Sequence, residues 1–350
     1  MSKAREGFLR VILTMVVALA IGALLIIGIG ENPISAYGAL LQGAFDGKFR
    51  LGTTLAGFTP LLLTSTAFAI AAKAGAFNVG VEGEVFLGGI VAAYIGINWT
   101  FLPKPLLLIA CFLGAMAVAA AWAFIPAVLK AYFDVSEVCV TILMNTVALH
   151  ITSYLVSGPM SAGTANAQTL PVTVTLYQFM TPSSANVGMF IAIVAVIAVI
   201  FMLYKTSWGY KIRTVGGNPS HADYVGISSK KVFIGAMMLS GMLGGMAGCI
   251  EVLGVHGYFL NNFATNLGSN GMLAALIVKN NMFATPFMAF FLAVLSAGGM
   301  GMQQMTGVPK ALVDTIAAVF IIIATMETLF TFKKRRDVRL AAKKEKEGQS

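Results

Sequence analysis

The segment AFNVGVEGE, residues 76–84, interrupts a very apolar chain with two glycines, an asparagine and two carboxylates. The apolar run after it, residues 85–97, is short, because a helix needs about 20 apolar residues to cross the hydrocarbon core of a bilayer. A second polar segment, HGYFLNNFATN at 256–266, precedes another short run at 267–278. Paired short spans at corresponding places in two halves are typical of the substrate site in transporters built from repeats. The pairing predicts the pore-forming part of a transporter.

The composition predicts an all-α integral membrane protein. The chain has 350 residues, of which 58% are hydrophobic and 11% charged, whereas a soluble protein carries about 25% charged residues. Long apolar runs recur along the whole length without the strict alternation of a membrane barrel. Because backbone groups in hydrocarbon must bond to one another, such runs form helices.

Ten membrane spans fit the apolar runs, with both termini in the cytoplasm. An even number of spans places nearly all Lys and Arg, including the basic tail at 333–350, on the cytoplasmic side. Five spans in each half of a single transmembrane domain (1–332) make the halves, about 1–157 and 187–332, inverted relative to one another. The expected spans are residues 8–30, 51–72, 85–97, 102–129, 138–157, 187–204, 232–254, 267–278, 282–303 and 311–332.

Two interpretations of AFNVGVEGE fit equally well. Its glycines permit an unwound backbone, whose freed groups would face a polar cavity together with Asn78 and Glu82. The alternative is an ordinary cytoplasmic turn with both acids in water. Asn145, in the middle of the fifth span, is likewise either a ligand contact or a bond between helices. The small residues of SGMLGGMAG, 240–248, predict close helix packing and no chemistry.

The basic loop at residues 205–231 contains a second candidate site. Pro219 after Asn218 is typical of a helix start. A short helix over residues 220–227 would expose Tyr224 and Val225 to a soluble partner. The alternative is a plain basic loop held by lipid headgroups, which is the common case for inner loops.

The chain lacks the motifs of nucleotide hydrolysis and of hydrolytic enzymes. No G-x-x-x-x-G-K-[ST] phosphate loop, HExxH, CxxC or GxSxG occurs, and the cysteines lack metal-ligand spacing. We therefore expect no enzymatic activity, metal site or cofactor on this chain. The net charge is +9, and the Lys and Arg residues that produce it cluster next to apolar spans, so nucleic-acid binding is not expected.

Three stretches resemble one family of membrane proteins. They are FNVGVEGE (77–84), SEVCVTILMN (136–145) and SWGYKIRTVGGNPSHADYVGIS (207–228). The chain resembles the permease subunits of bacterial ATP-binding-cassette (ABC) importers, in the branched-chain amino acid and simple-sugar permease family, and is most similar to the nucleoside-uptake permeases. The resemblance runs from about residue 51 to residue 330.

The resemblance implies a type II ABC importer fold in the bacterial cell membrane. Expected partners are a second permease subunit, identical or related, a cytoplasmic ATPase that holds ATP and Mg²⁺, an extracellular solute-binding protein and membrane lipid. The long uncharged loop at 158–188 would help to receive the binding protein. The implied substrate path passes Phe77, Asn78, Glu82 and Asn145. The implied coupling segment that meets the ATPase comprises Asn218, Pro219, Ala222, Asp223, Tyr224, Val225, Gly226 and Ile227.

The predicted function is nucleoside uptake by alternating access, driven by a separate ATPase. Glu84 stands where the family often has Gln, and the second acid beside Glu82 favours a neutral solute. A simple-sugar or branched-chain amino acid permease is the alternative. An ion-driven secondary transporter is a weaker one, because it requires an essential intramembrane acid and few mid-span charges are present. An intramembrane enzyme or a membrane anchor fits less well.

Overall fold

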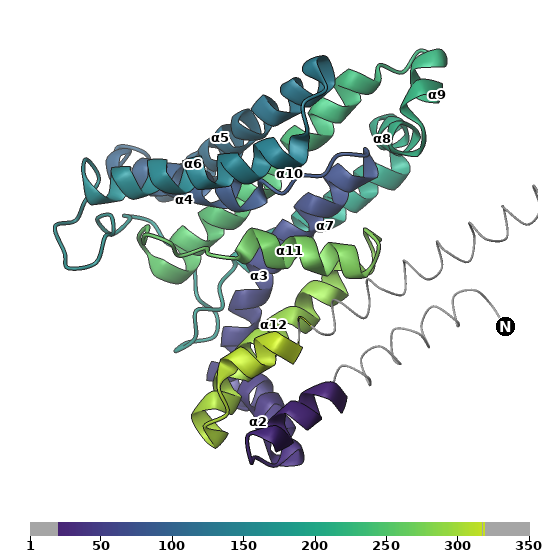
Figure 1. The fold of residues 1–350 in the computed structure, drawn as a ribbon. Coiled ribbons are helices and arrows are strands. Elements are labelled where there is room, and N and C mark those ends of the chain that lie inside the picture. The colour runs from purple at the N-terminus through teal and green to yellow at the C-terminus, as the bar shows by residue number, and fades with distance from the viewer. Residues whose placement is uncertain (1–19, 317, 319–350) are drawn as a thin grey trace, which may run out of the picture. The chain divides into compact units, whose positions relative to one another are not determined.

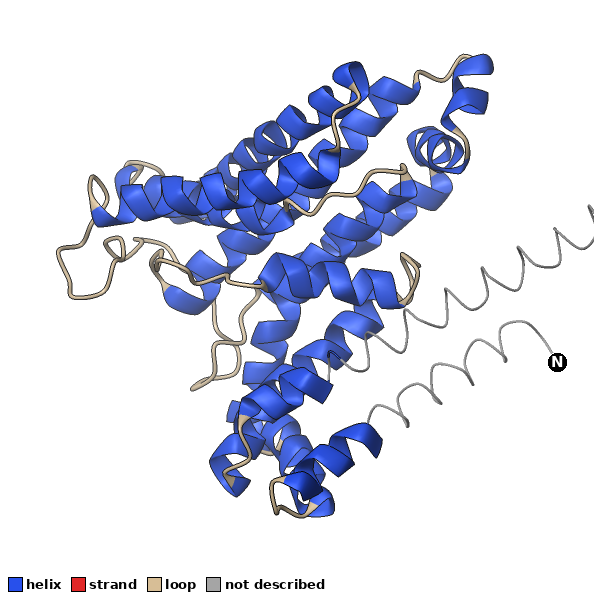
Figure 2. Ribbon diagram, viewed as in Figure 1, coloured by secondary structure: helices blue, strands red, loops and turns tan. Residues whose placement is uncertain are grey.

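The computed structural model describes residues 20–316 and 318, and each regular element in this part of the chain is a helix (Figure 2). The chain divides into two compact units. The larger is Ala44–Ala297, and the smaller combines Met1–Gly43 with Gly298–Ser350. The predicted basic tail at 333–350 and nearly all of the predicted span at 311–332 lie outside the described residues.

The larger unit contains nearly all the described helices (Figure 1). They are α3 (Gly47–Lys73), α4 (Val81–Asn98), α5 (Lys104–Phe133), α6 (Glu137–Ser157), α7 (Gly188–Lys205), α8 (Ser207–Gly217), α9 (Pro219–Tyr224), α10 (Ser229–Ile250), the π-helix η1 (Glu251–His256), α11 (Leu267–Ile277) and most of α12 (Thr285–Thr306).

The smaller unit begins with a sharply bent helical pair. Ala20–Gly28 and α2 (Pro33–Phe45) meet at an angle of 113°. The sequence predicts a first span at 8–30 but not the following helix α2; the part of that span before residue 20 is outside the described residues. Near the other end of the unit, Gly301 of α12 packs so closely on the backbone of Gly43 that a side chain there would overlap it.

Seven described helices are long and apolar enough to cross a membrane, namely α3, α4, α5, α6, α7, α10 continued by η1, and α12. The predicted total of ten spans and the cytoplasmic termini stay predictions. The third span is longer than predicted, since α4 has 18 residues and begins at Val81. Glu82 and Glu84 belong to its first turn, where acids are stabilised by the helix dipole. The eighth span is short as predicted, because α11 has 11 residues.

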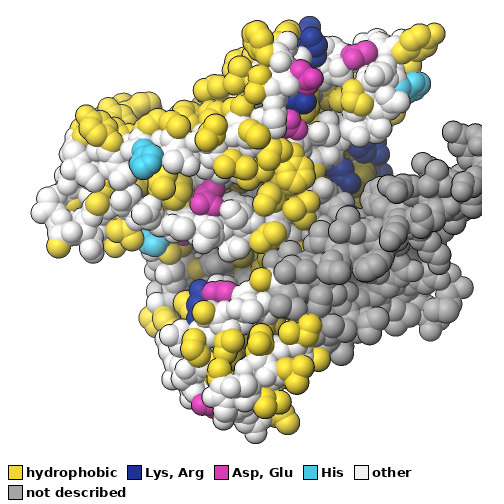
Figure 3. All heavy atoms as spheres, in the orientation of Figure 1, with side chains coloured by type: hydrophobic (Ala, Val, Ile, Leu, Met, Phe, Trp, Pro, Cys, Tyr) yellow, Lys and Arg dark blue, Asp and Glu magenta, His cyan; other side chains and the backbone are white. Residues whose placement is uncertain are grey.

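The outer helices present apolar side chains to their surroundings. α5, α6 and α7 are mostly exposed along their apolar windows, whereas α3 and α4 are mostly buried. Leu113, Leu143 and Phe201 are among the exposed side chains, and Figure 3 shows apolar groups over much of the visible face. Continuous apolar surface of this kind marks contact with lipid or protein. The chain is a multi-pass membrane protein.

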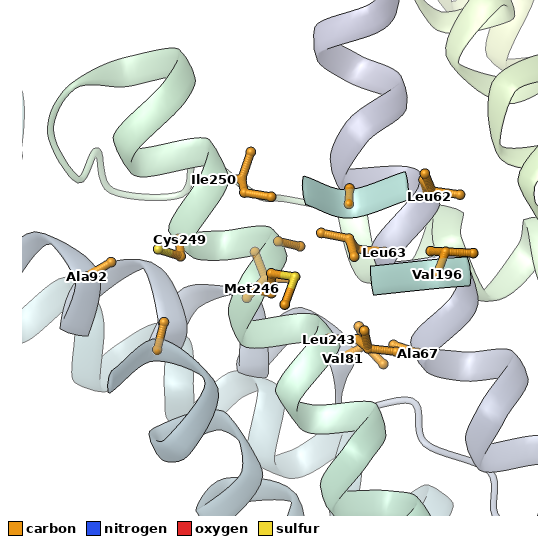
Figure 4. Close-up of a cluster of buried hydrophobic side chains, with 14 of the residues drawn as sticks. Leu62, Leu63, Ala67, Val81, Ala92, Val196, Leu243, Met246, Cys249 and Ile250 are labelled. Carbon is orange, nitrogen blue, oxygen red and sulfur yellow. The ribbon is translucent and has the colours of Figure 1, made fainter. Parts of the chain in front are cut away.

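The core of the larger unit forms where α3, α4, α7 and α10 meet (Figure 4). Leu62 and Leu63 of α3 lie beside Val196 of α7, and Met246 and Ile250 reach the same cluster from α10. In a lipid-embedded protein such contacts stabilise by close van der Waals packing between helices.

Glycines allow α10 to approach α4 closely, as the SGMLGGMAG segment predicted. A Cβ atom on Gly248 would overlap the carbonyl oxygen of Val85, and one on Gly88 would overlap the backbone of Gly245. α11 approaches α3 in a similar way, because a Cβ on Gly271 would overlap the side chain of Thr64. α10 also packs closely on α5, because a Cβ on Gly241 would overlap the carbonyl oxygen of Ala119.

Replacement of Gly248 by alanine is expected to lower the thermal midpoint of the purified protein. The new methyl group overlaps backbone atoms that cannot rotate away, and overpacking of this kind costs about 1–3 kcal/mol. The matched control is Gly57→Ala on α3, where the added Cβ meets open space. Thermal unfolding in detergent, followed by circular dichroism, compares the two. Equal midpoints would contradict the packing described here.

Candidate functional site

The connection between α3 and α4, residues 74–80, is partly buried: Gly75 and Phe77 are exposed, whereas most of the other residues are buried. It reaches Ser240, which is 11 residues into α10 and so about 16 Å along that helix. A Cβ on Gly80 would lie 3.1 Å from the Cβ of Thr141, one turn into α6. The first turn of α4 therefore lies beyond the first turn of α6 and further still from the start of α10. The count of spans and of Lys and Arg residues, by contrast, predicts that this segment is at the inner face of the membrane.

Asn78 ties the connection to α4 and α10. Its side chain is fully buried, and its Nδ2 donates to Glu84 Oε1 and to Ser240 Oγ, both at 2.9 Å. Its Oδ1 accepts a hydrogen bond from the backbone N–H of Gly80 at 3.0 Å. The amide is thus fully engaged inside the protein, which removes the cost of burying unpaired polar groups.

The Glu84 side chain packs against α10 at Gly244, which has no side chain. A Cβ on Gly244 of α10 would stand 2.9 Å from Glu84 Oε2. Glu84 is 1% exposed, and within the described residues its Oε2 accepts no hydrogen bond. Glu84 therefore relies on the amide of Asn78 for its polar contact.

Asn145 ties α6 to the same segment. Its Oδ1 accepts from the N–H of Gly83 at 2.8 Å, and its Nδ2 donates to the carbonyl of Val79 at 2.9 Å. The N–H groups of a helix's first turn have no partner within the helix, so a side-chain oxygen from a neighbour satisfies one of them. In this conformation the half-buried Asn145 bonds protein backbone, and its place in a substrate path stays a prediction.

Glu82 lies where the first turns of α4 and α11 meet. Its Oε2 accepts a hydrogen bond from Ser269 Oγ at 3.3 Å, and a Cβ on Gly268 would lie 2.5 Å from its backbone nitrogen. Each helix N-terminus carries a partial positive charge, which stabilises a carboxylate between them. Phe77 is nearby in sequence, 36% exposed, with its ring edge-on to Phe68 at 4.8 Å.

The sequence singled out the four residues of the predicted path but not the serines that hydrogen-bond two of them. Asn78, Glu82 and Asn145 stood out as polar groups in an apolar chain, whereas Ser240 and Ser269 did not. Ser240 belongs to the small-residue segment, and only its position on the face toward α4 gives it a hydrogen-bonding role. No signal in a single sequence pairs residues 162 positions apart, as Asn78 and Ser240 are.

The predicted short helix in the basic loop is present as α9. Asn218 caps it, with its Oδ1 accepting from the N–H of His221 at 3.1 Å, and Pro219 occupies the first turn. Ala222 is fully buried, whereas the side chain of Tyr224 is 91% exposed. The preceding helix, α8, was not predicted.

Asp223 fastens α9 to the start of α10. Its Oδ1 accepts from the backbone N–H of Ser229 at 2.8 Å, and its Oδ2 accepts from Ser229 Oγ at 2.7 Å. These hydrogen bonds hold the pKa of Asp223 below its ordinary value of 3.8. Gly216 of α8 packs on the backbone of Lys73. The loop thus contacts the end of α3 and the start of α10, the two helices that enclose residues 74–80.

The comparisons with known proteins agree with one family. Residues 50–325 match the family described as branched-chain amino acid transport system / permease component. The chain is 33% identical to the glucose ABC transporter permease protein TsgB13 of Haloferax volcanii, over 91% of this chain and 87% of the relative. It is 32% identical to the guanosine ABC transporter permease protein NupP of Bacillus subtilis, over 95% and 97%. It is 30% identical to the nucleoside ABC transporter permease protein NupB of Lactococcus lactis, over 89% and 88%.

A double-mutant cycle tests the contact between Asn78 and Glu84. Asn78→Ala should destabilise the protein by about 1–3 kcal/mol, because it leaves the buried Glu84 without its donor. Glu84→Met in the same chain should restore part of this loss, since removing both partners of a buried bond is less costly than removing one. Urea or thermal unfolding in detergent measures the four proteins. Additive effects would show that the two side chains do not interact.

Proposed function

This chain belongs to the family of branched-chain amino acid transport system permease components, and on that premise we propose that it imports nucleosides. It is the permease subunit of an ABC transporter. The observation that carries the choice of solute is the likeness, over nearly the whole chain, to permeases named for guanosine and for nucleosides. A partner ATPase would bind ATP and Mg²⁺ and would carry out ATP hydrolysis.

The charges at the candidate site support a neutral solute. Glu82 belongs to the first turn of α4 and is partly exposed, and the hydrogen bond to its side chain comes from Ser269, which is neutral. A carboxylate-bearing solute would meet repulsion there, because charges in a low-dielectric interior interact strongly. A nucleoside carries no charge at neutral pH. The same argument disfavours a free amino acid.

The four predicted path residues would act in two ways. Glu82 and Phe77 are partly exposed and would contact the passing solute. The side-chain amides of Asn78 and Asn145 form hydrogen bonds with the α3–α4 connection and the first turn of α4, and would hold the connection in place. The meeting of the α4 and α11 first turns at Glu82 supports a path here, since helix N-termini inside the bundle are typical of transporter sites.

The coupling proposal assigns the α9 region to the ATPase. Tyr224 and Val225 are exposed and would contact it directly. Asp223 would pass the movement to α10, whose Ser240 touches the α3–α4 connection. Alternating access would follow if each ATPase state favours one arrangement of these helices. A second permease subunit and an extracellular binding protein would complete the importer.

The close helix pairs support the proposed inverted halves. In two five-span halves, α3 corresponds to α10 and α4 corresponds to α11. The observed contacts exchange these partners, because α4 packs on α10 and α11 packs on α3. A two-fold relation between inverted repeats produces reciprocal pairs of this kind.

Glucose is the second candidate solute, because the glucose permease of Haloferax volcanii is 33% identical to the chain. The test is uptake by the complete importer, reconstituted in proteoliposomes with its ATPase and binding protein. We expect ATP-dependent uptake of labelled guanosine or uridine, and little uptake of glucose or leucine. Uptake of glucose alone would replace the proposed solute. Nucleoside uptake by the permease alone, driven by a proton gradient, would reject the ATP-driven mechanism.

Two substitutions in α9 should separate docking from transmission. Tyr224→Ala removes an exposed side chain and should weaken co-purification of the ATPase. Asp223→Ala should leave the ATPase bound but reduce the stimulation of ATP hydrolysis by solute, because α9 is no longer fastened to α10. Pull-down and ATPase assays on the full complex measure both effects. Full stimulation in Asp223→Ala would show that the contact with Ser229 transmits nothing.

The low pKa of Asp223 predicts how this contact depends on pH. A depressed pKa in the folded protein means that the ionised group stabilises the fold above the ordinary value of 3.8. The contribution is lost only as the pH falls through the still lower folded value. Coupling through Asp223 should therefore stay constant across neutral and mildly acidic pH. A loss of coupling near neutral pH would point to another group.

A further inference from the structure

A second polar and aromatic cluster lies at the far end of α10 from the α8–α9 segment. α10 and η1 together run for 28 residues, about 42 Å, so their two ends are a membrane thickness apart. Figure 1 shows α8 and α9 beside one of these ends. Glu251, His256, Tyr258 and Phe263 gather at the other, and we refer to them as the η1 cluster. None of these residues belongs to the sequence-predicted site.

The π-helical turn brings an acid and an imidazole together. In a π-helix the hydrogen bonds join residues five apart, and Glu251 and His256 have this separation. His256 Nε2 lies 3.7 Å from Glu251 Oε2. Within the described residues the Glu251 carboxyl group accepts no hydrogen bond. An acid at the end of a membrane span with so few partners is by default a candidate functional group.

The α6–α7 loop, residues 158–187, holds this turn in place. The N–H of Leu176 donates to the carbonyl of Leu253 at 2.8 Å, and Gln178 Nε2 donates to the carbonyl of Gly254 at 3.2 Å. Further along, the N–H of Val172 donates to the carbonyl of Gly257 at 2.9 Å. The backbone around the η1 cluster is therefore hydrogen-bonded within the turn and just after it. A site held in this way loses little conformational entropy when it binds a ligand.

Buried rings support the partly exposed ring of Phe263. It lies nearly perpendicular to Phe86, with ring centroids 5.6 Å apart, and to Phe259 at 5.1 Å. Both supporting side chains are buried. His256 lies 5.8 Å from Phe263, and Tyr258 lies 6.3 Å from His256. The η1 cluster thus consists of partly exposed aromatic and polar side chains that pack on the buried rings of Phe86 and Phe259.

We propose that the η1 cluster is a nucleoside-binding site, at the end of α10 where the solute enters. The nucleobase would stack on the exposed part of Phe263, with the edge of the base toward the imidazole of His256, whose ring is nearly perpendicular to that of Phe263. The ribose hydroxyls would donate hydrogen bonds to the Glu251 carboxyl group, which accepts none within the described residues. A nucleotide would lose the hydration of its anionic phosphate beside this largely buried acid, which disfavours nucleotides. This inference rests on the proposed function and adds a site to it.

The test uses the complete importer and four variants of this chain. Phe263→Leu removes the stacking ring, Phe263→Tyr retains it, and Glu251→Gln removes the carboxylate. The matched control is Phe201→Leu, an exposed aromatic residue of α7 outside the cluster. We expect Phe263→Leu and Glu251→Gln each to raise the half-saturating guanosine concentration about tenfold. Phe263→Tyr and Phe201→Leu should match the unmodified protein.

A binding measurement keeps the inference testable if a variant misfolds. Phe263→Trp places a fluorescent ring at the proposed stacking position, and guanosine should quench its emission after subtraction of the signal from the unmodified protein. Guanosine 5′-monophosphate and glucose should not. Absence of quenching by guanosine would overturn the inference, and so would unchanged half-saturation in properly folded Phe263→Leu and Glu251→Gln.

These results separate the inference from the proposed function. If the unmodified importer takes up glucose and no nucleoside, the proposed solute fails, and the nucleoside site fails with it. If nucleosides are taken up but the variants at Phe263 and Glu251 behave like Phe201→Leu, only the η1 cluster is rejected.

Discussion

The structure depends on one constraint: inside a membrane, each backbone amide that leaves a helix must find a partner within the protein. The chain leaves its helices inside the bundle in two places, before α4 and before α11. Before α4, the amides of Asn78 and Asn145 satisfy the freed groups. Before α11, backbone groups of the α6–α7 loop do so, and the hydroxyl of Thr169 accepts from the N–H of Phe259. Polar residues in an otherwise oily chain are thus first a requirement of the fold.

That requirement changes how buried polar residues are interpreted. Asn78 is fully buried and uses both amide hydrogens and its oxygen in hydrogen bonds to protein, so in this conformation it has no hydrogen left to donate to a solute. Glu82 and Glu251 differ, because each is partly exposed and has a single polar contact among the described residues. Residues with spare hydrogen-bonding capacity are better candidates for solute contact than residues that are merely polar and buried. Glu82 lies near α11 and Glu251 is the first residue of η1, which suits a path with more than one solute contact.

Much of this organisation can be predicted from the sequence, because it depends on local composition. Apolar runs locate the long helices, the Asn218–Pro219 pair marks the start of α9, and the small residues at 240–248 mark the close approach of α10 to α4. The start of α4 is harder to predict, since acids at a helix N-terminus look like a polar interruption when only hydropathy is considered. The π-turn, the α8 helix and the partnership of Asn78 with Ser240 depend on contacts between distant segments. No local pattern encodes them.

The arrangement of α10 has a mechanical consequence. One continuous rod of 28 residues carries the Asp223 attachment at its start, Ser240 near its middle and Glu251 and His256 at its end. If the rod tilts about its middle, its two tips swing in opposite directions, and a tilt of 10° moves each tip by about 4 Å for a length near 42 Å. A push at the tip near Asp223 would then narrow one mouth of the pathway while it widens the other. Rigid-body tilting of this helix would open the pathway to one side of the membrane at a time, without a chain of side-chain rearrangements.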